Sequence, residues 1–176
     1  MQNDILAAVA IVAVFGASVA AQVQKQEVAG VRNYSRVDAT VGCGGAVDPA
    51  AMAALKSEGY VSVINLRQAA EPGADIEAGR AAAQTAGLKY IHLPFNVASP
   101  DTTVVDNFLA AVADTSNQPV FIHCGSANRV GGMWMIKRVL QDGWAIDRAR
   151  TEAEAIGLSS APLIAFATEY IKAHAK

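Results

Sequence analysis

The chain has 176 residues, of which 52% are hydrophobic and 17% charged, and its formal net charge is −2. This length suits one domain with its own hydrophobic core. The charged fraction is too low for a disordered chain, and a slightly acidic sequence without a basic run excludes the electrostatic pattern of a nucleic-acid binder. Two cysteines and no cysteine–histidine cluster exclude a disulfide framework and a structural metal site, so we expect no metal and no cofactor.

The amino-terminal segment differs from the rest of the chain. Residues 5–15 are all apolar, and Ser18-Val19-Ala20 has the small-x-small spacing of a signal cleavage site. The segment predicts a signal peptide over 1–20 and a periplasmic or secreted mature protein, in which Cys43 and Cys124 are free to pair. No lysine or arginine precedes the apolar run, so an uncleaved membrane anchor, a buried helix or a wrongly assigned start are the alternatives. Membrane contact is expected only for the uncleaved form.

Residues 21–34 are polar and predict a spacer before a single domain over 35–176. Within that domain, strands are predicted at two places in 31–47 and then at three short β-rich runs: 61–66, 90–93 and 120–123. Helices are predicted from the apolar periodicity and the capping residues at five places: 48–59, 75–86, 103–113, 146–156 and 162–173. A further helix follows residue 127 and ends at Gly143. The alternation predicts a three-layer α/β fold, with a mostly parallel sheet of four or five strands between helices.

The chemistry-bearing residues gather after the strand 120–123. Ligands of open α/β sheets bind at the carboxyl ends of the strands. Cys124 follows the strand directly and precedes a short turn and a helix, where backbone N–H groups and the helix dipole favour a thiolate. Arg129 is placed to clamp a tetrahedral oxyanion through two N–H groups. The remaining anion-binding residues are expected to be Gly125, Ser126, Ala127 and Asn128. This pattern predicts nucleophilic attack by Cys124 on phosphorus or sulfur, the alternative being a structural cysteine beside a surface arginine.

The segment from His123 to Gly131, HCGSANRVG, resembles the phosphate-binding loop of protein tyrosine and dual-specificity phosphatases. More narrowly, it resembles that of the bacterial beta-lactamase-hydrolase-like phosphatases. Further segments resemble landmarks of that group in the same order: VGCGG from Val41, GYVSVINLR from Gly59, EPG from Glu71 and YIHLP from Tyr90. The resemblance covers residues 35–173. It implies a protein tyrosine phosphatase-like fold and a cysteinyl-phosphate mechanism without metal. The implied substrates are phosphorylated peptides or small molecules, phosphotyrosine among them.

The loop departs from the usual phosphatase pattern at three positions. Arg129 lies five residues after Cys124 instead of six, and Val130 replaces the serine or threonine that usually follows. Ala127 stands where related loops usually have glycine, which restricts a left-handed backbone there. The shorter loop is similar to that of rhodanese-type sulfurtransferases, so a Cys124 persulfide enzyme is the alternative activity. An inactive oxyanion-binding module is the second alternative.

The proton donor for the leaving group is less well defined. The resemblance places an aspartate on the loop after the strand at Tyr90, but Val97 occupies the corresponding position. We therefore expect Asp101 to be the general acid, with Glu71, Asp75 or no acid as alternatives. The competing interpretation of Asp101 is an acidic residue at a helix start.

Other residues have two interpretations each. Arg67 ends a strand at the reactive edge and is expected to bind the substrate, or else to pair with Glu71. His123 is expected to orient the loop through a hydrogen bond, and His92 to be a hydrogen-bonded core residue. Cys43 is interpreted as a small buried side chain, with a disulfide to oxidised Cys124 as the alternative.

Overall fold

The computed structural model of the protein describes residues 23–175. The signal peptide predicted over 1–20 lies outside these residues. In the part of the chain that is described, no helix combines the length and the apolar character needed to cross a membrane.

Six strands form one mixed sheet in the order β1-β2-β3-β6-β4-β5. The four central strands run parallel: β3 (Val41–Gly44), β6 (Val120–His123), β4 (Ser62–Asn65) and β5 (Lys89–His92). Two strands of two residues each add an antiparallel edge beside β3: β1 (Gln24–Lys25) and β2 (Ser35–Arg36). The predicted α/β fold with a mostly parallel sheet is confirmed. The sheet has one strand more than predicted, because a strand of two residues leaves no alternation pattern to find.

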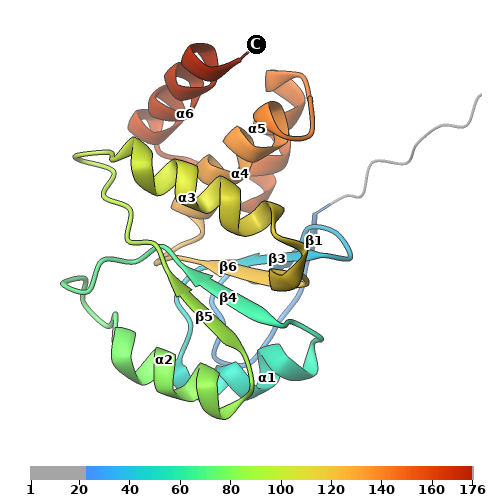
Figure 1. Ribbon diagram of the computed structural model, residues 1–176, viewed down its shortest axis with the longest axis vertical. Coiled ribbons are helices and arrows are strands. Elements are labelled where there is room, and N and C mark those ends of the chain that lie inside the picture. The colour runs from blue at the N-terminus through green and yellow to red at the C-terminus, as the bar shows by residue number, and fades with distance from the viewer. Residues whose placement is uncertain (1–22, 176) are drawn as a thin grey trace, which may run out of the picture.

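Helices cover both faces of the sheet (Figure 1). One face carries a 3₁₀ turn and two helices: η1 (Pro49–Ala51), α1 (Met52–Ser57) and α2 (Ile76–Thr85). The other face carries four helices: α3 (Thr102–Ala113), α4 (Asn128–Leu140), α5 (Ile146–Ile156) and α6 (Ala161–His174). A second 3₁₀ turn, η2 (Thr115–Asn117), precedes β6. In α3 the buried residues Val105, Phe108 and Val112 recur with helical spacing and form its core-facing side.

Helix α3 begins at Thr102, one residue before the predicted start at 103. Asp101 is the N-cap, and its side chain accepts a hydrogen bond of 2.8 Å from the backbone N–H of Thr103. Aspartate is a strong capping group at this position, which agrees with the competing interpretation of Asp101 as an acidic residue at a helix start.

The predicted spacer over 21–34 also differs from the structure. From Gln24 onward the chain belongs to the fold, since β1 pairs with β2. Lys25 Nζ donates to the carbonyl oxygen of Ile156 at 2.9 Å and to Asn33 Oδ1 at 2.7 Å. These contacts use polar side chains and backbone carbonyls, so the segment shows no apolar periodicity and looks like a spacer in the sequence.

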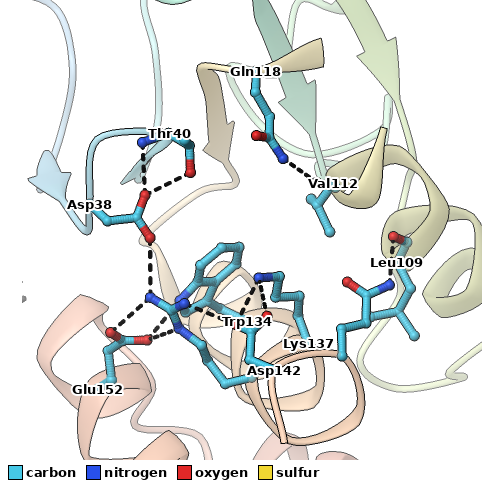
Figure 2. Close-up of polar contacts among 11 residues, drawn as sticks. Asp38, Thr40, Leu109, Val112, Gln118, Trp134, Lys137, Asp142 and Glu152 are labelled. Carbon is cyan, nitrogen blue, oxygen red and sulfur yellow. Dashed lines mark hydrogen bonds and ion pairs between the residues drawn. The ribbon is translucent and has the colours of Figure 1, made fainter. Parts of the chain in front are cut away.

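A buried ion cluster fastens α4 to α5 and to the turn between β2 and β3. The guanidinium of Arg138 donates to Glu152 at 2.6 and 3.1 Å, and both residues are 8% exposed. It also lies 4.7 Å from the ring centre of Trp134 and 3.3 Å from Asp38 Oδ2. Figure 2 shows Trp134, Glu152 and Asp38 close together, joined by these contacts. Trp134 Nε1 donates a third hydrogen bond to Glu152 at 2.8 Å, so both oxygens of the buried carboxylate are hydrogen-bonded.

We expect Glu152→Ala to lower the free energy of unfolding by about 3 kcal/mol, because Arg138 and Trp134 lose three hydrogen bonds to a buried carboxylate while Asp142 and Asp38 still compensate part of the charge of Arg138. The matched control on the same helix is Glu154→Ala, whose ion pair with Arg150 is about half exposed and whose loss should cost less than about 0.5 kcal/mol. Urea denaturation measures both. Equal costs for the two variants would contradict the buried role of Glu152.

Candidate active site

The loop 124–127 joins β6 to α4 at the carboxyl ends of the parallel strands. The end of β3 and the residues that follow it are hydrogen-bonded to this loop. The backbone N–H of Cys124 donates to the carbonyl of Gly44, and the N–H of Ala46 donates to the carbonyl of Gly125 at 3.0 Å. A Cβ on Gly45 would lie 3.1 Å from the Gly125 carbonyl oxygen, so the loop packs directly on this glycine. Cys124 is 1% exposed, and its sulfur therefore lies beneath the loop and not on the surface.

The backbone N–H groups of residues 125–129 are available for a ligand. Among the residues that the structure describes, none of these five groups donates a hydrogen bond to another protein group. Amides of this kind at a helix start form a binding site for an anion, because each carries a partial positive charge and the helix dipole adds to it. The predicted anion-binding residues therefore present the donors that a tetrahedral oxyanion needs.

Ala127 adopts the left-handed conformation, with φ of 79°, and is the residue before α4. The chain takes this conformation in spite of the alanine. Gly157 makes room for the Ala127 methyl group, since a Cβ on Gly157 would lie only 3.0 Å from it. Ala127 therefore carries the local cost of a left-handed alanine, about 1–2 kcal/mol, and Gly157 at the end of α5 supplies only the space for its methyl group.

Arg129 is largely buried and is held by two loops, those after β4 and β5. Its guanidinium donates to both oxygens of Glu71, at 2.5 and 2.8 Å, and to the carbonyls of Leu66 and Phe95 at 3.0 and 3.2 Å. The same group lies against the loop, since Nη2 is 3.7 Å from the position of a Cβ on Gly125. Burial works against the charge of Arg129, but the hydrogen bonds to Glu71 and the neighbouring Cys124 outweigh it and raise its pKa.

Glu71 is the partner that fixes this arginine. Burial opposes its ionisation, but hydrogen bonds from Arg129, from the backbone N–H of Gln68 and from Arg67 lower the pKa of Glu71 to about 2. A carboxylic acid with so low a pKa has no proton to give near neutral pH. Glu71, one of the alternatives for the general acid, is therefore a positioning residue for Arg129.

The other two acidic candidates cap helices. Asp101 accepts from Thr103 N at the start of α3, and Asp75 accepts from the N–H of Ala78 at 2.9 Å at the start of α2. Neither side chain has a described hydrogen bond to the loop after β6. The expectation that Asp101 donates a proton therefore has no contact in the structure to support it.

Arg67 is 7% exposed and fully engaged within its own loop. Its guanidinium donates to the carbonyls of Pro72 and Gly73 at 2.7 and 2.9 Å and to Glu71 at 3.3 Å. The alternative interpretation of Arg67, an ion pair with Glu71, is confirmed. Since its N–H groups hold the segment that carries Glu71, Arg67 acts on the site through that carboxylate, and direct binding of substrate by Arg67 finds no support.

The two histidines behave differently. His92 is hydrogen-bonded as expected, with Nε2 at 2.8 Å from the carbonyl oxygen of Arg67. The predicted orienting hydrogen bond of His123 is absent among the described residues, because neither ring nitrogen has a partner. The ring instead stacks near Phe121, and burial lowers its pKa to about 4, so it is neutral. It borders a cavity of about 20 Å³, which is room for one water molecule.

Cys43 and Cys124 are both free thiols. In the register of β3 against β6, Cys43 lies opposite Ile122, two residues before Cys124. One strand across and two residues along correspond to roughly 8 Å between the two Cα atoms. A disulfide needs less than about 7 Å, so pairing would require the backbone to move. Burial raises the pKa of the Cys43 thiol, which agrees with the interpretation of a small inert side chain.

One contact to the loop was not foreseen. Asn33 Nδ2 donates to the carbonyl of Ser126 at 3.1 Å and to that of Ile156 at 3.3 Å. Its φ of 51° is a left-handed conformation that asparagine tolerates better than most residues. An isolated asparagine in a polar segment carries no pattern, so no sequence signal pointed to it.

The fold is of the tyrosine phosphatase-like class, and the loop between β6 and α4 brings Cys124 and Arg129 together at the carboxyl ends of the strands. Residues 33–141 match the family described as "Beta-lactamase hydrolase-like protein, phosphatase-like domain", and the chain belongs to this family. The family indicated by the sequence motifs is thus confirmed. A search of curated proteins finds no match.

Solved structures agree on the fold. TpbA of P. aeruginosa is 20% identical with a TM-score of 0.67, over 88% of this chain and 91% of TpbA. The core catalytic domain of the PP-IP phosphatase SIW14 from S. cerevisiae is 19% identical with a TM-score of 0.68, over 82% of this chain and 88% of that domain.

The pKa of Glu71 leads to a prediction about acid stability. The stabilisation from ionised Glu71 is complete above its ordinary pKa of 4.5 and disappears as the pH falls through about 2. Glu71→Gln should therefore lower the free energy of unfolding by about 1.5–3 kcal/mol at pH 7, and the difference from the wild type should shrink between pH 4.5 and 2. Urea denaturation at several pH values checks this. The exposed Glu77→Gln is the control, and a pH-independent difference for Glu71→Gln would refute the argument.

The contact between Ala127 and Gly157 leads to a second prediction. Gly157→Ala places a methyl group 3.0 Å from Ala127 at a φ of 148°, and we expect it to cost about 3 kcal/mol or more and to weaken binding of vanadate. The control is Gly87→Ala, which has a φ of 72° but nothing within 4 Å, and should cost about 1–2 kcal/mol without affecting vanadate. Thermal denaturation and vanadate titration measure the two effects; unchanged vanadate affinity in Gly157→Ala would refute the link to the loop.

Proposed function

We propose that the protein is a cysteine-dependent phosphatase that hydrolyses phosphomonoesters. Cys124 attacks the phosphorus atom as a thiolate, and Arg129 together with the amides of residues 125–129 binds the three non-bridging oxygens. The leaving group departs with the electron pair of its P–O bond. Water then attacks the cysteinyl phosphate, the S–P bond breaks, and the thiolate is regenerated as phosphate leaves.

The observation that carries this proposal is that the five amides next to the buried Cys124, those of residues 125–129, donate to no protein group in the described part of the chain. Oxyanion donors fixed in place before the reaction stabilise the charge that develops in the transition state, without any reorganisation during the reaction. Arg129 is fixed in the same way, by two bonds to Glu71 and two to backbone carbonyls. The family and the fold are those of phosphatases, which supports phosphorus over sulfur as the atom attacked.

Two related structures suggest the kind of substrate. One TpbA structure is a complex with phosphotyrosine, and SIW14 is a phosphatase of PP-IP. We propose that this site likewise takes a phosphorylated peptide or small molecule, with the aryl phosphate of phosphotyrosine as the reference substrate. Gly125, Ser126, Ala127 and Asn128 bind the phosphoryl group through their backbone.

We expect Cys124→Ser to abolish release of phosphate from p-nitrophenyl phosphate while vanadate or sulfate still raises its thermal stability. Arg129→Lys keeps the charge but loses the planar pair of donors, and should lower kcat/KM by about 10²–10³-fold. Cys43→Ala is the matched thiol control and should keep the activity, because Cys43 lies away from the loop.

A parallel assay with thiosulfate and cyanide tests the sulfurtransferase alternative. Formation of thiocyanate without release of phosphate from any aryl phosphate would disprove the proposed function. Binding of oxyanions without turnover in either assay would indicate the inactive module instead.

A further inference from the structure

We propose that the leaving group receives no proton from the protein, so that the site releases phosphate only from weakly basic leaving groups, such as phenoxides or phosphate anions, and not from alkyl esters. This inference rests on the proposed function and narrows its substrate class. It follows from what each acidic or basic side chain around the loop is bonded to.

Four carboxylates lie on the loops that follow β3, β4 and β5 and meet the loop after β6: Asp48, Glu71, Asp75 and Asp101. Glu71 is closest to the anion site, with Oε2 3.8 Å from the position of a Cβ on Gly125. Both of its oxygens accept charged hydrogen bonds from Arg129. A proton on this carboxyl group would break the ion pair of Glu71 with Arg129. Glu71 therefore positions Arg129 and does not act as an acid.

The remaining carboxylates are directed elsewhere. Asp75 and Asp101 cap helices α2 and α3, and moving either to a leaving group would uncap a helix. Asp48 faces Gly30, where its Oδ2 lies 3.4 Å from the position of a Cβ. Helix starts therefore hold Asp75 and Asp101, and Asp48 is directed towards the backbone at Gly30.

Residues 93–100, which pass next to Arg129, carry no ionisable side chain. The carbonyl of Phe95 accepts from Arg129, which places this segment at the site. The next residues form a turn closed by the bond of 3.0 Å from Ala98 N to Asn96 Oδ1, and Val97 within that turn packs on the core. A valine and an asparagine amide have no proton to transfer at neutral pH.

The histidines do not replace the missing acid. His92 is bonded to the carbonyl of Arg67. His123 lies beneath the loop with both ring nitrogens buried, and a neutral imidazole has no excess proton to donate.

The consequence follows from the basicity of the leaving oxygen. When Cys124 attacks, the S–P bond forms and the P–O bond breaks, and the oxygen leaves with its electron pair to be protonated later by water. An unassisted alkoxide is about as basic as hydroxide and therefore a far poorer leaving group than a phenoxide, whose conjugate acid has a pKa of about 10, or a phosphate dianion, whose conjugate acid has a pKa of about 6. Anhydrides and esters of acidic phenols should therefore react fastest and phosphoserine slowest.

The experiment is a series of substituted phenyl phosphates with the wild-type protein, extended by pyrophosphate and acetyl phosphate at one end and by phosphoserine at the other. We expect kcat/KM to fall about five- to tenfold for each unit of leaving-group pKa, because a positioned acid that would flatten this slope is missing. Phosphoserine should be at least about 10⁴-fold slower than p-nitrophenyl phosphate. The two anhydrides show whether a charged leaving group fits the site as well as an aryl one.

Asp101→Asn and Asp75→Asn are the matched controls and should leave the slope unchanged. A nearly flat slope in the wild type would overturn the inference. It would equally be overturned if Asp101→Asn slowed phenyl phosphate and left p-nitrophenyl phosphate unaffected, since Asp101 would then be the acid. In both of these outcomes the protein is still a phosphatase, whereas release of phosphate from none of the substrates would refute the proposed function itself.

Discussion

The ion pair between Glu71 and Arg129 is the interaction on which the organisation of the site depends. It joins the loop after β4 to the first turn of α4, two segments separated by 58 residues. Arg67 also donates to Glu71, so this carboxylate lies between two guanidinium groups. Arg67 further holds the loop in place through hydrogen bonds to the carbonyls of Pro72 and Gly73. An anion-binding loop with an unfixed arginine would have to order that side chain on each binding event, at a cost in conformational entropy. Here the ordering is part of folding.

Helix α4, which starts at the loop, carries a second buried arginine, Arg138, near its carboxyl-terminal end. Arg129 and Arg138 have different roles. The charge of Arg138 is compensated by three carboxylates, those of Glu152, Asp142 and Asp38, and is therefore not available to a ligand. Its guanidinium also stacks on two tryptophan rings. Arg129 faces one carboxylate and two carbonyls, beside five amides without partners. The amino-terminal end of α4 therefore has a positive electrostatic potential available for an anion. The carboxyl-terminal turns of α4 fix the helix against α5 and the sheet.

Much of the fold could be predicted from the sequence, because its central strands and helices are marked by strong local patterns. The runs 61–66, 90–93 and 120–123 became β4, β5 and β6, and Cys124 follows β6 as expected. The first strand, β1, could not be predicted, since a strand of two residues has no periodicity, whereas β2 and β3 lie within the segment 31–47 where two strands were predicted. The site was predicted where residue type alone is informative, as for the cysteine and the arginine. It was less predictable where a partner decides the role. Glu71 and Asp101 are both acidic residues on loops, and only the three-dimensional contacts show that Glu71 positions Arg129 and that Asp101 caps a helix.

The methyl group of the left-handed Ala127 fits because Gly157, at the end of α5, has no side chain. The two positions therefore share one small space, and the cost of a substitution at either depends on the other. A glycine at 127 would remove the contact of 3.0 Å that a methyl group at 157 makes, so the effects of the two substitutions should not add. Divergence of this loop from the glycine-containing form would thus depend on a residue 30 positions away, which couples the shape of the anion site to the packing of the carboxyl-terminal helices.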